Sequence, residues 1–223
     1  MNDNTSAFCA SKYEEEIRTV LPYYDDFYKQ VVDIAKVQFS EPLTWLDVGC
    51  GTGKMAEAAF KALDIKKFVF CDSSEEMIKV AKKRFSGDKS EFTLSTFPEL
   101  NQDIPFDVIT AVMVFHYFKK EARREAIQKC YRNLHSNGIF ITFENFAPYS
   151  EVGKHLLLDR WRAYQLSQGR SGESCNKHLG RYGSEFFPIS ISEHLELLRQ
   201  CGFIQAEVLW VSNMQVGLLG VKQ

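Results

Sequence analysis

A glycine-rich segment after the first long apolar run of the chain has the residue types of a ligand-binding turn. It reads Asp47-Val48-Gly49-Cys50-Gly51-Thr52-Gly53. Glycines let the backbone turn sharply and bring a ligand against the main chain, at the sheet edge where open α/β folds bind ligands. The spacing is G-x-G-x-G, whereas dinucleotide-binding loops have G-x-G-x-x-G. Asp47 suits an amino-acid head group, reached directly or through water, whereas a diphosphate prefers an unopposed helix N-terminus.

A second acidic residue, Asp72, ends the next apolar run, about twenty residues further along. A carboxylate at this position can accept two hydrogen bonds from a ribose diol, as it does in dinucleotide-binding folds. The competing interpretation is a negative charge that stabilises the N-terminus of the following helix. Met77 follows on that helix and can lie against an adenine ring or belong to the core. Together with the glycine segment, Asp72 favours a nucleoside ligand.

His116 is the best candidate for a proton acceptor in the chain. It follows the fourth predicted strand, and a histidine positioned there can remove a proton from an incoming nucleophile. The competing and more common role is a histidine packed among the aromatic residues on either side of it. His178 and Arg181 are weaker candidates for contact with the second reactant.

The elements that must position these residues alternate along the middle of the chain. We expect strands at 44–48, 67–71, 91–95, 106–114 and 138–143. Helices are expected at 54–63, after a capping box at 73–76, and at 121–134, with a stop near Asn137-Gly138. Strands that alternate with helices indicate parallel pairing, with helices on both faces of the sheet.

The flanking segments follow different patterns. Residues 13–39 are predicted to be helical and interrupted at Pro22, because proline disrupts a helix interior. A capped helix at 190–201 ends at Gly202, and strands at 206–211 and 215–221 form a hairpin. Residues 146–188 read as an irregular, partly helical insertion outside the sheet.

These patterns predict a doubly wound, Rossmann-like α/β fold with seven strands, mostly parallel, a C-terminal antiparallel hairpin and a helical lid. We expect one domain over residues 1–223. It is divided into a helical cap at 1–40, a core at 41–145, a lid at 146–188, and a helix with the hairpin at 189–223.

The composition is that of a globular protein: 45% of the 223 residues are hydrophobic, and the formal net charge is -2. The lack of concentrated positive charge argues against a broad nucleic-acid contact. The polar first ten residues do not resemble a signal peptide, and no apolar stretch approaches the length of a membrane span. The six cysteines form no C-x-x-C pair, so we expect reduced thiols, no metal site and a cytoplasmic protein.

Four stretches resemble class I S-adenosylmethionine-dependent methyltransferases. They are W-L-D-V-G-C-G-T-G, F-C-D-S-S-E-E-M-I, P-F-D-V-I-T-A-V-M-V-F-H-Y and N-L-H-S-N-G-I-F-I-T-F-E, and they span most of the chain. The resemblance implies S-adenosyl-L-methionine as the cofactor and methyl transfer as the activity.

The resemblance also implies roles for individual residues. Gly49, Cys50 and Gly51 would hold the methionine portion through the backbone, and Asp72 with Ser73 would lie at the ribose. Many members carry an acidic residue after the third strand for the adenine amino group. This chain has Ser95-Thr96-Phe97 there, so adenine contacts would come from backbone or hydroxyl groups. The expected cofactor-binding residues are Tyr24, Asp47, Gly49, Cys50, Gly51, Gly53, Asp72, Ser73, Met77, Thr96, Phe97, Ala111 and Val112.

The flanks are similar to a subgroup that includes carboxy-S-adenosylmethionine synthase, an enzyme of tRNA modification. R-T-V-L-P-Y-Y near the N-terminus and G-F-I-Q-A-E-V-L-W-V-S-N-M-Q-V-G-L-L-G-V-K near the C-terminus carry this likeness, which implies Tyr24 folding over the cofactor. The chain departs from the synthase at Gly51-Thr52-Gly53 and at Val112, where the synthase has a polar residue. Arg181 is the candidate for the synthase's carboxylate-binding arginine. We interpret the chain as a relative that transfers a methyl group.

The acceptor is expected to bind between the cap and the lid, where aromatic residues are concentrated. These aromatics suit a flat or apolar acceptor, or they form the core of the lid itself. The expected substrate-binding residues are Tyr13, Trp161, His178, Arg181 and Tyr182. We expect a small-molecule acceptor, no membrane or nucleic-acid partner, and leave a homodimer open. The alternatives are a carboxy-S-adenosylmethionine synthase-like enzyme, a nicotinamide-dependent dehydrogenase and a non-catalytic sensor.

Overall fold

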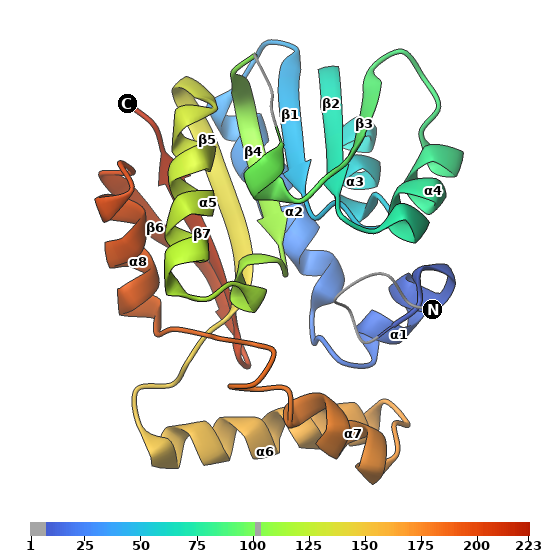
Figure 1. The fold of residues 1–223 in the computed structure, drawn as a ribbon, viewed down its shortest axis with the longest axis vertical. Helices are drawn as coiled ribbons and strands as arrows, with labels where there is room; N and C mark the ends of the chain where they lie inside the picture. The colour runs from blue at the N-terminus through green and yellow to red at the C-terminus, as the bar shows by residue number, and fades with distance from the viewer. Residues whose placement is uncertain (1–7, 101–103) are drawn as a thin grey trace.

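A computed structural model describes residues 8–100 and 104–223. Its centre is one seven-stranded sheet in the order β3-β2-β1-β4-β5-β7-β6 (Figure 1). All neighbouring pairs from β3 to β5 are parallel, and β7 is antiparallel to both of its neighbours. The predicted mostly parallel sheet with a C-terminal antiparallel hairpin is therefore confirmed. The strands are β1 (Leu43–Val48), β2 (Ile65–Asp72), β3 (Ser90–Leu94), β4 (Phe106–Val112), β5 (Leu134–Asn145), β6 (Gln205–Ser212) and β7 (Gln215–Val221).

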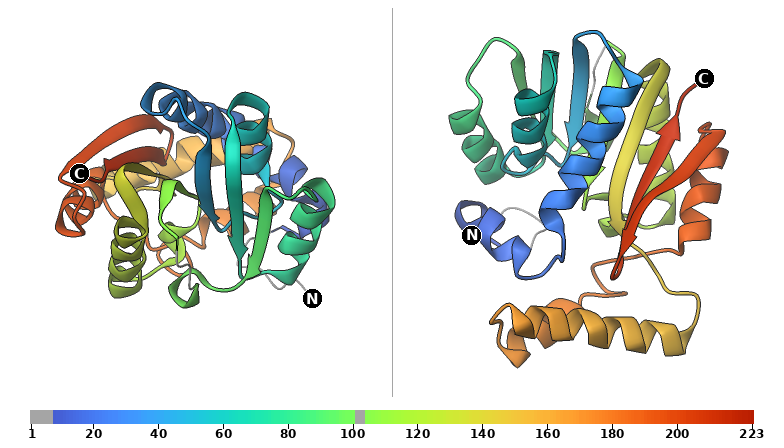
Figure 2. Two further views of the ribbon diagram at one scale, coloured as in Figure 1. Left: turned by 90° about the horizontal axis from the view of Figure 1, so that it is seen from above. Right: turned by 180° about the vertical axis from the view of Figure 1, so that it is seen from behind.

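Helices cover both faces of the sheet (Figure 2). One face packs against α2 (Tyr24–Gln38), α3 (Lys54–Ala62) and α4 (Glu75–Arg84) through a cluster of buried apolar side chains. The other face packs against α5 (Lys120–Arg132) and α8 (Ile191–Gln200) through a second cluster. The continuous burial of β1, β2 and β4 explains their runs of apolar residues, because both faces of these strands are covered.

The register of the central strands fixes where ligands can bind. Val48 in β1 lies opposite Cys71 of β2 and Ala111 of β4. The three strands therefore end at the same level, and the loops that follow them meet at one edge. In Figure 1 this edge faces downward, toward the N-terminal cap and the insertion.

The described part of the cap that precedes α2 and the lid both lie at this edge of the sheet (Figures 1 and 2). The cap contains η1 (Ala10–Lys12) and α1 (Tyr13–Arg18), and the predicted break at Pro22 separates α1 from α2. The lid contains α6 (Glu151–Ser167) and α7 (Gly172–Leu179) and adds no strand to the sheet. Short turns η2 (Phe97–Glu99) and η3 (Phe115–Tyr117) complete the loops after β3 and β4.

Two local predictions were wrong in detail. The capping box at 73–76 does not form, because α4 begins at Glu75 and its third residue is Met77, which has no side-chain acceptor to return the bond. Ser74 still caps the helix by accepting a hydrogen bond from the Met77 backbone N–H at 3.1 Å. β5 begins at Leu134, before the expected stop. Asn137 adopts a positive φ of 65°, and its N–H bonds the Lys222 carbonyl, so the strand continues through this residue.

Candidate functional site

Three adjoining cavities lie at the carboxyl ends of the strands. The largest, about 290 Å³, is lined by the glycine loop, Asp72 and the loops after β3 and β4. A second, of about 20 Å³, lies between the glycine loop and α2, and a third, of about 30 Å³, lies between the cap and the lid. Tyr13 of α1 lines all three, so the cap sits where the cavities meet. We call them the loop cavity, the α2 cavity and the lid cavity.

The glycine loop is fixed to the end of β2 by its own backbone. The N–H groups of Gly49 and Cys50 donate to the Cys71 carbonyl at 2.8 and 3.0 Å. Gly49 has a φ of +66°, and a Cβ at this residue would stand 2.4 Å from Val114 Cγ2. Gly51 has a φ of +53°, but a Cβ there would meet no atom within 4 Å. The loop is therefore packed tightly at Gly49 and open to the cavities at Gly51.

Asp72 connects this loop to α4. One of its carboxylate oxygens accepts from the Gly51 N–H and the other from the Ser74 N–H, each at 2.9 Å. A carboxylate has about four lone-pair positions. Through its bonds to the Gly51 and Ser74 N–H groups, Asp72 holds the backbone on both sides of the loop cavity, and it also lines that cavity.

Asp47 is buried at the α2 cavity and is connected to the sheet interior. The Thr110 hydroxyl donates to its Oδ1 at 2.7 Å, and the Trp45 indole N–H donates to the same hydroxyl at 2.9 Å. Burial raises the pKa of Asp47 to about 7, against the lowering effect of the Thr110 hydrogen bond; the negative charge of Asp72 adds to the rise. Asp47 is therefore poised to gain or lose a proton near neutral pH.

The cap is held on the glycine loop by a polar cluster that the sequence did not reveal. The Thr52 hydroxyl donates to the Glu14 carboxylate at 2.8 Å, and Arg84 forms an ion pair with the same carboxylate. Arg84 also donates to the Thr52 carbonyl at 2.8 Å. These residues come from α1, the glycine loop and α4, so the cluster fixes α1 over the loop.

His116 lies at the lid cavity with its side chain 1% exposed. Its Nδ1 is 3.0 Å from Oε2 of Glu144, which also accepts from the His116 backbone N–H at 2.7 Å. The other Glu144 oxygen accepts from the Phe115 N–H at 3.1 Å and from the Thr142 hydroxyl at 2.5 Å. Burial raises the pKa of Glu144, but the interactions with His116 and Thr142 outweigh it, so the pKa lies below its ordinary value. An ionised Glu144 requires the His116 proton on Nδ1, which leaves Nε2 as the basic nitrogen.

The lid is joined to the cap by hydrogen bonds across the lid cavity. The Trp161 indole N–H donates to the Val20 carbonyl, and the Tyr164 hydroxyl donates to the Arg18 carbonyl, both at 2.7 Å. Trp161, His178 and Arg181 line the cavity from the lid side. Segments 120 or more residues apart in the chain therefore close one space, as the aromatic composition of both segments led us to expect.

Most of the residues predicted from the sequence line the three cavities. The loop cavity contains Gly49, Gly51, Asp72, Ser73, Met77, Thr96, Phe97 and Val112. The α2 cavity adds Tyr24, Asp47 and Cys50, and the lid cavity contains Tyr13, His116, Trp161, His178 and Arg181.

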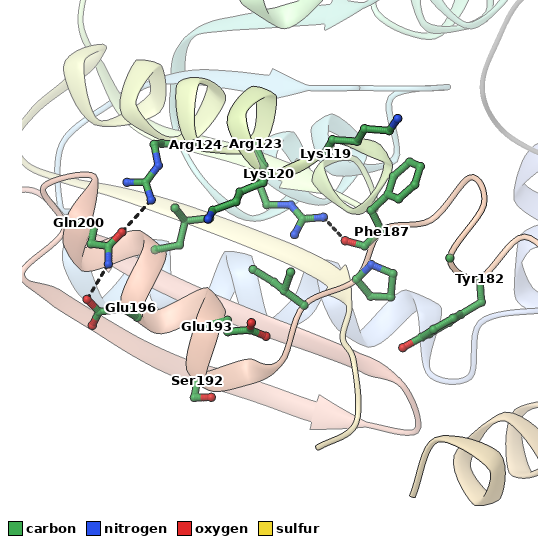
Figure 3. A pocket seen from close by; sticks show the side chains of 14 residues that line it. Lys119, Lys120, Arg123, Arg124, Tyr182, Phe187, Ser192, Glu193, Glu196 and Gln200 are labelled. Carbon is green, nitrogen blue, oxygen red and sulfur yellow. Dashed lines mark hydrogen bonds between the residues drawn. The ribbon is translucent and has the colours of Figure 1, made fainter. Parts of the chain in front are cut away.

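Three predicted residues lie elsewhere. A Cβ at Gly53 would meet the Phe85 ring at 2.7 Å, so this glycine allows α3 to begin close to α4. Ala111 is fully buried in β4. Tyr182 lines a separate groove of about 850 Å³ between α5 and α8 (Figure 3).

That groove is walled by basic residues of α5 and acidic residues of α8 (Figure 3). Arg123 stands at its base and donates to the carbonyls of Phe115, Phe118 and Phe187 at 3.0, 3.0 and 2.5 Å. This arginine ties the turn that carries His116 to the end of the lid, so it has a structural role in shaping the lid cavity.

Met113 and Tyr117 belong to the site and were not predicted. Both line the loop cavity and the lid cavity and so lie between them. Met113 has a φ of 59°, an uncommon conformation for a non-glycine residue that often accompanies a functional site.

No helix in the described part of the chain has both the length and the apolar character to cross a membrane.

A family model for a methyltransferase domain matches residues 46–140. The chain is 26% identical to the carboxy-S-adenosyl-L-methionine synthase of Nautilia profundicola, over 92% of this chain and 88% of the synthase. It is 28% identical to the synthase of Campylobacter fetus, over 90% of this chain and 86% of that protein. These matches extend through the cap and the lid as well as the matched domain.

Solved methyltransferase structures share the fold. Magnesium protoporphyrin IX methyltransferase from Synechocystis with bound SAM superposes with a TM-score of 0.62 at 15% identity, covering 100% of this chain and 87% of that one. The plantazolicin methyltransferase BpumL with a triazolic analog and SAH has a TM-score of 0.70 at 16% identity, covering 96% and 91% of the two chains. The dehydrogenase alternative receives no support from these comparisons.

Proposed function

We propose that this chain, a class I S-adenosylmethionine-dependent methyltransferase, transfers a methyl group to a small molecule bound between its cap and its lid. The observation that carries the proposal is the junction of the loop cavity with the lid cavity at Tyr13, Met113 and Tyr117. A cofactor in the first cavity and an acceptor in the second would meet there, shielded from water by the cap and the lid.

The residues of the loop cavity and the α2 cavity fit S-adenosylmethionine. The open space at Gly51 leaves its backbone accessible to a ligand, and Asp47 and Asp72 supply negative charge on either side. We assign the methionine end to the α2 cavity with Asp47 and Cys50. The ribose is assigned to Asp72 with Ser73, and the adenine to the space between Met77 and Phe97. When bound, this cofactor supplies an activated methyl group on a sulfonium.

The raised pKa of Asp47 predicts that cofactor affinity depends on pH. S-adenosylmethionine is cationic and should prefer ionised Asp47, so its binding weakens as the pH falls below about 7. We expect the Kd to rise by about tenfold between pH 8 and pH 6, the limit for one linked proton being roughly tenfold per pH unit. Calorimetry at both pH values measures this change. In Asp47→Asn this rise in Kd should disappear. A rise of equal size in that variant would assign the pH dependence to another group.

The cluster around Glu14 predicts tighter cofactor binding by the wild-type protein than by a variant that lacks this carboxylate. Glu14→Ala removes the Arg84 ion pair and the Thr52 hydrogen bond, so α1 should separate from the glycine loop more often. We expect the Kd for S-adenosylhomocysteine to rise about twofold to tenfold, since one hydrogen bond contributes about 0.5–1.5 kcal/mol. Glu15→Ala, on the exposed side of the same helix, is the control. Equal affinities for both variants would show that the cap does not retain the cofactor.

His116 is the residue that we assign to proton removal. Glu144 fixes the ring orientation and holds the proton on Nδ1, so Nε2 can accept a proton from a hydroxyl, amine or thiol of the acceptor. Tyr13 and Tyr117 exclude water, and the alignment of the reacting atoms supplies most of the remaining acceleration.

Two measurements test the proposed activity. Mass spectrometry of the ligand that co-purifies with the protein should identify S-adenosylmethionine or S-adenosylhomocysteine. A panel of small phenols, amines and thiols should then reveal acceptors that increase S-adenosylhomocysteine release. Release that never rises above the acceptor-free rate, together with tight cofactor binding, would favour a non-catalytic sensor.

Carboxy-S-adenosylmethionine synthesis is the second candidate, favoured by the likeness to carboxy-S-adenosyl-L-methionine synthases over 92% and 90% of the chain. Val112 lines the cavity where the synthase has a polar residue, which argues for methyl transfer. A carboxylated sulfonium in the co-purifying ligand would decide for the synthase, and its absence with measurable methyl transfer would decide against it.

The lid contacts predict that ligand binding orders two distant segments together. Because Trp161 and Tyr164 hydrogen-bond the cap, residues 13–28 and 146–188 should both gain protection from hydrogen exchange when S-adenosylhomocysteine is added. Trp161→Ala should raise the acceptor KM more than the cofactor Kd. Leu156→Ala, on the exposed side of α6, is the control. Protection limited to the glycine loop would place the acceptor elsewhere.

A further inference from the structure

The lid contains an unusual concentration of buried polar atoms without partners. Nine buried side-chain nitrogen and oxygen atoms in the described chain have no hydrogen-bond partner. Five of them belong to Gln165, Arg170 and His178: both polar atoms of the Gln165 amide, both ring nitrogens of His178, and Nε of Arg170. Such atoms destabilise a fold, so a concentration of them in one segment indicates a place where a ligand supplies the missing bonds.

Gln165 and His178 lie on the sides of the lid helices that face the protein, and Arg170 lies in the turn between α6 and α7. The buried residues of α6 are Trp161 and Gln165, one turn apart on the same helix face, and those of α7 are Cys175 and His178. The Trp161 and His178 rings make an edge contact with centroids 5.4 Å apart, and both line the lid cavity that contains His116. Arg170 donates its backbone N–H to the Gln165 carbonyl at 3.2 Å. Of the three residues, only His178 lines the lid cavity; Gln165 lies one turn beyond Trp161 on the same buried face of α6, behind that cavity.

The unpartnered atoms include both donors and acceptors. Burial, with the charges of Arg181 and Arg170, lowers the pKa of His178 to about 3, so its ring is neutral and offers one donor and one acceptor. The Gln165 amide likewise offers both. A carboxylate only accepts hydrogen bonds, so it would leave Gln165 Oε1 and one His178 nitrogen unpartnered. A carboxamide or lactam edge carries a donor beside an acceptor and can satisfy both residues.

Arg170 does not require an anion in this space. Its two terminal nitrogens donate to the hydroxyls of Thr19 at 3.3 Å and Ser174 at 2.6 Å, and its guanidinium lies 5.5 Å from the Phe8 ring centroid. The side chain as a whole is half-buried, so solvent screens its charge. It contributes one further donor, Nε–H, to the group of unpartnered atoms.

We propose that Gln165, His178 and Arg170 recognise the end of the acceptor remote from the methylated atom, and that this end is an uncharged amide-like group. The inference rests on the proposed function, because it assigns the acceptor to the lid cavity. Trp161 and Phe186, whose rings both contact His178, would flank a flat body that joins the amide end to the nucleophile near His116. The cavity of about 30 Å³ holds about one water molecule, and Gln165 and Arg170 do not line it. The acceptor therefore reaches these residues when the lid and the cap separate, which breaks the contacts of Arg170 with Thr19 and of Tyr164 with Arg18.

Benzamide and benzoate test the proposal because they share a ring and differ only in the terminal group. With S-adenosylhomocysteine saturating, benzamide should bind the wild-type protein at least tenfold more tightly than benzoate in calorimetric titrations. Gln165→Leu should remove this preference, whereas Gln168→Leu, the same change on the exposed side of the lid, should preserve it. Ligand-free Gln165→Leu should melt at the same or a higher temperature, because it removes two unpartnered atoms.

Equal or tighter binding of benzoate, failure of both probes to bind, or an unchanged preference in Gln165→Leu would overturn the proposal. A lower melting temperature of Gln165→Leu with unchanged preference would assign the polar atoms to structural water instead. 4-Hydroxybenzamide separates this inference from the proposed function, since it adds a nucleophile to the same probe. An amide preference without methyl transfer to any acceptor of the panel would refute the methyltransferase activity alone. Transfer without an amide preference would refute the lid assignment alone.

Discussion

His116→Asn is expected to lower kcat for methyl transfer by about 10²- to 10⁴-fold, the usual contribution of a positioned general base. The asparagine amide can keep the hydrogen bond that His116 Nδ1 makes with Glu144, but it has no counterpart of Nε2. The Kd for S-adenosylhomocysteine should stay within about twofold of the wild-type value, because His116 lines the lid cavity and not the loop cavity and because effects at separate sites are independent to within about 0.3–0.5 kcal/mol. Steady-state kinetics and calorimetry on the same preparation measure both effects.

His194→Asn supplies the matched control for this change. His194 is also buried, at 3% exposure, but it lies on α8 and lines none of the three cavities. Its loss should affect thermal stability without a selective loss of kcat. If His116→Asn retains full kcat with an acceptor that must lose a proton, His116 has only a packing role and the acceptor arrives already deprotonated.

Gly49→Ala is expected to weaken cofactor binding by about 30-fold to several thousand-fold. A left-handed residue with a Cβ costs about 1–2 kcal/mol, and the contact of 2.4 Å with Val114 adds about 1–3 kcal/mol of overpacking. The backbone that lines two cavities must move to relieve both effects. Gly51→Ala has the same unfavourable φ but open space around its Cβ, so it should weaken the free energy of cofactor binding by only about 1–2 kcal/mol. Calorimetric Kd values that are equal for the two variants would mean that the contact with Val114 is relieved without moving the loop.

The core of the fold was predictable because each central strand is buried on both faces. Burial of this kind requires continuous apolar runs such as the one that includes Trp45, and helices between such runs impose parallel pairing. The boundaries were less predictable. Ser73 and Ser74 are adjacent possible caps, and only the backbone conformation decides that Ser74 precedes α4. Leu134 joined β5 through its pairing with Phe106, a long-range contact that local sequence does not encode.

The residues that we assign to the cofactor follow from a contiguous motif, whereas several of those that we assign to the acceptor do not. Glu144 lies near the end of β5, after a run of buried residues, and its role depends on the turn after β4 that brings His116 against it. Gln165 carries no sequence signal, because a single glutamine on a helix is usually exposed. Tyr182 was misplaced because the segment after α7 has no periodicity from which to predict its direction. Contacts between segments far apart in the chain determine each of these positions.

The two ends of the lid lie within a hydrogen bond of each other: the Ala147 N–H donates to the Ile189 carbonyl at 2.8 Å. A segment whose ends coincide can be exchanged by recombination for another of different length without altering the register of β5 or the start of α8. The sheet and the glycine loop would then pass unchanged from parent to descendant while the exchanged segment brings a new specificity. With the acceptor bound by the lid as proposed, preference for an acceptor can evolve as a separable module, at a different pace from the affinity for the methyl donor.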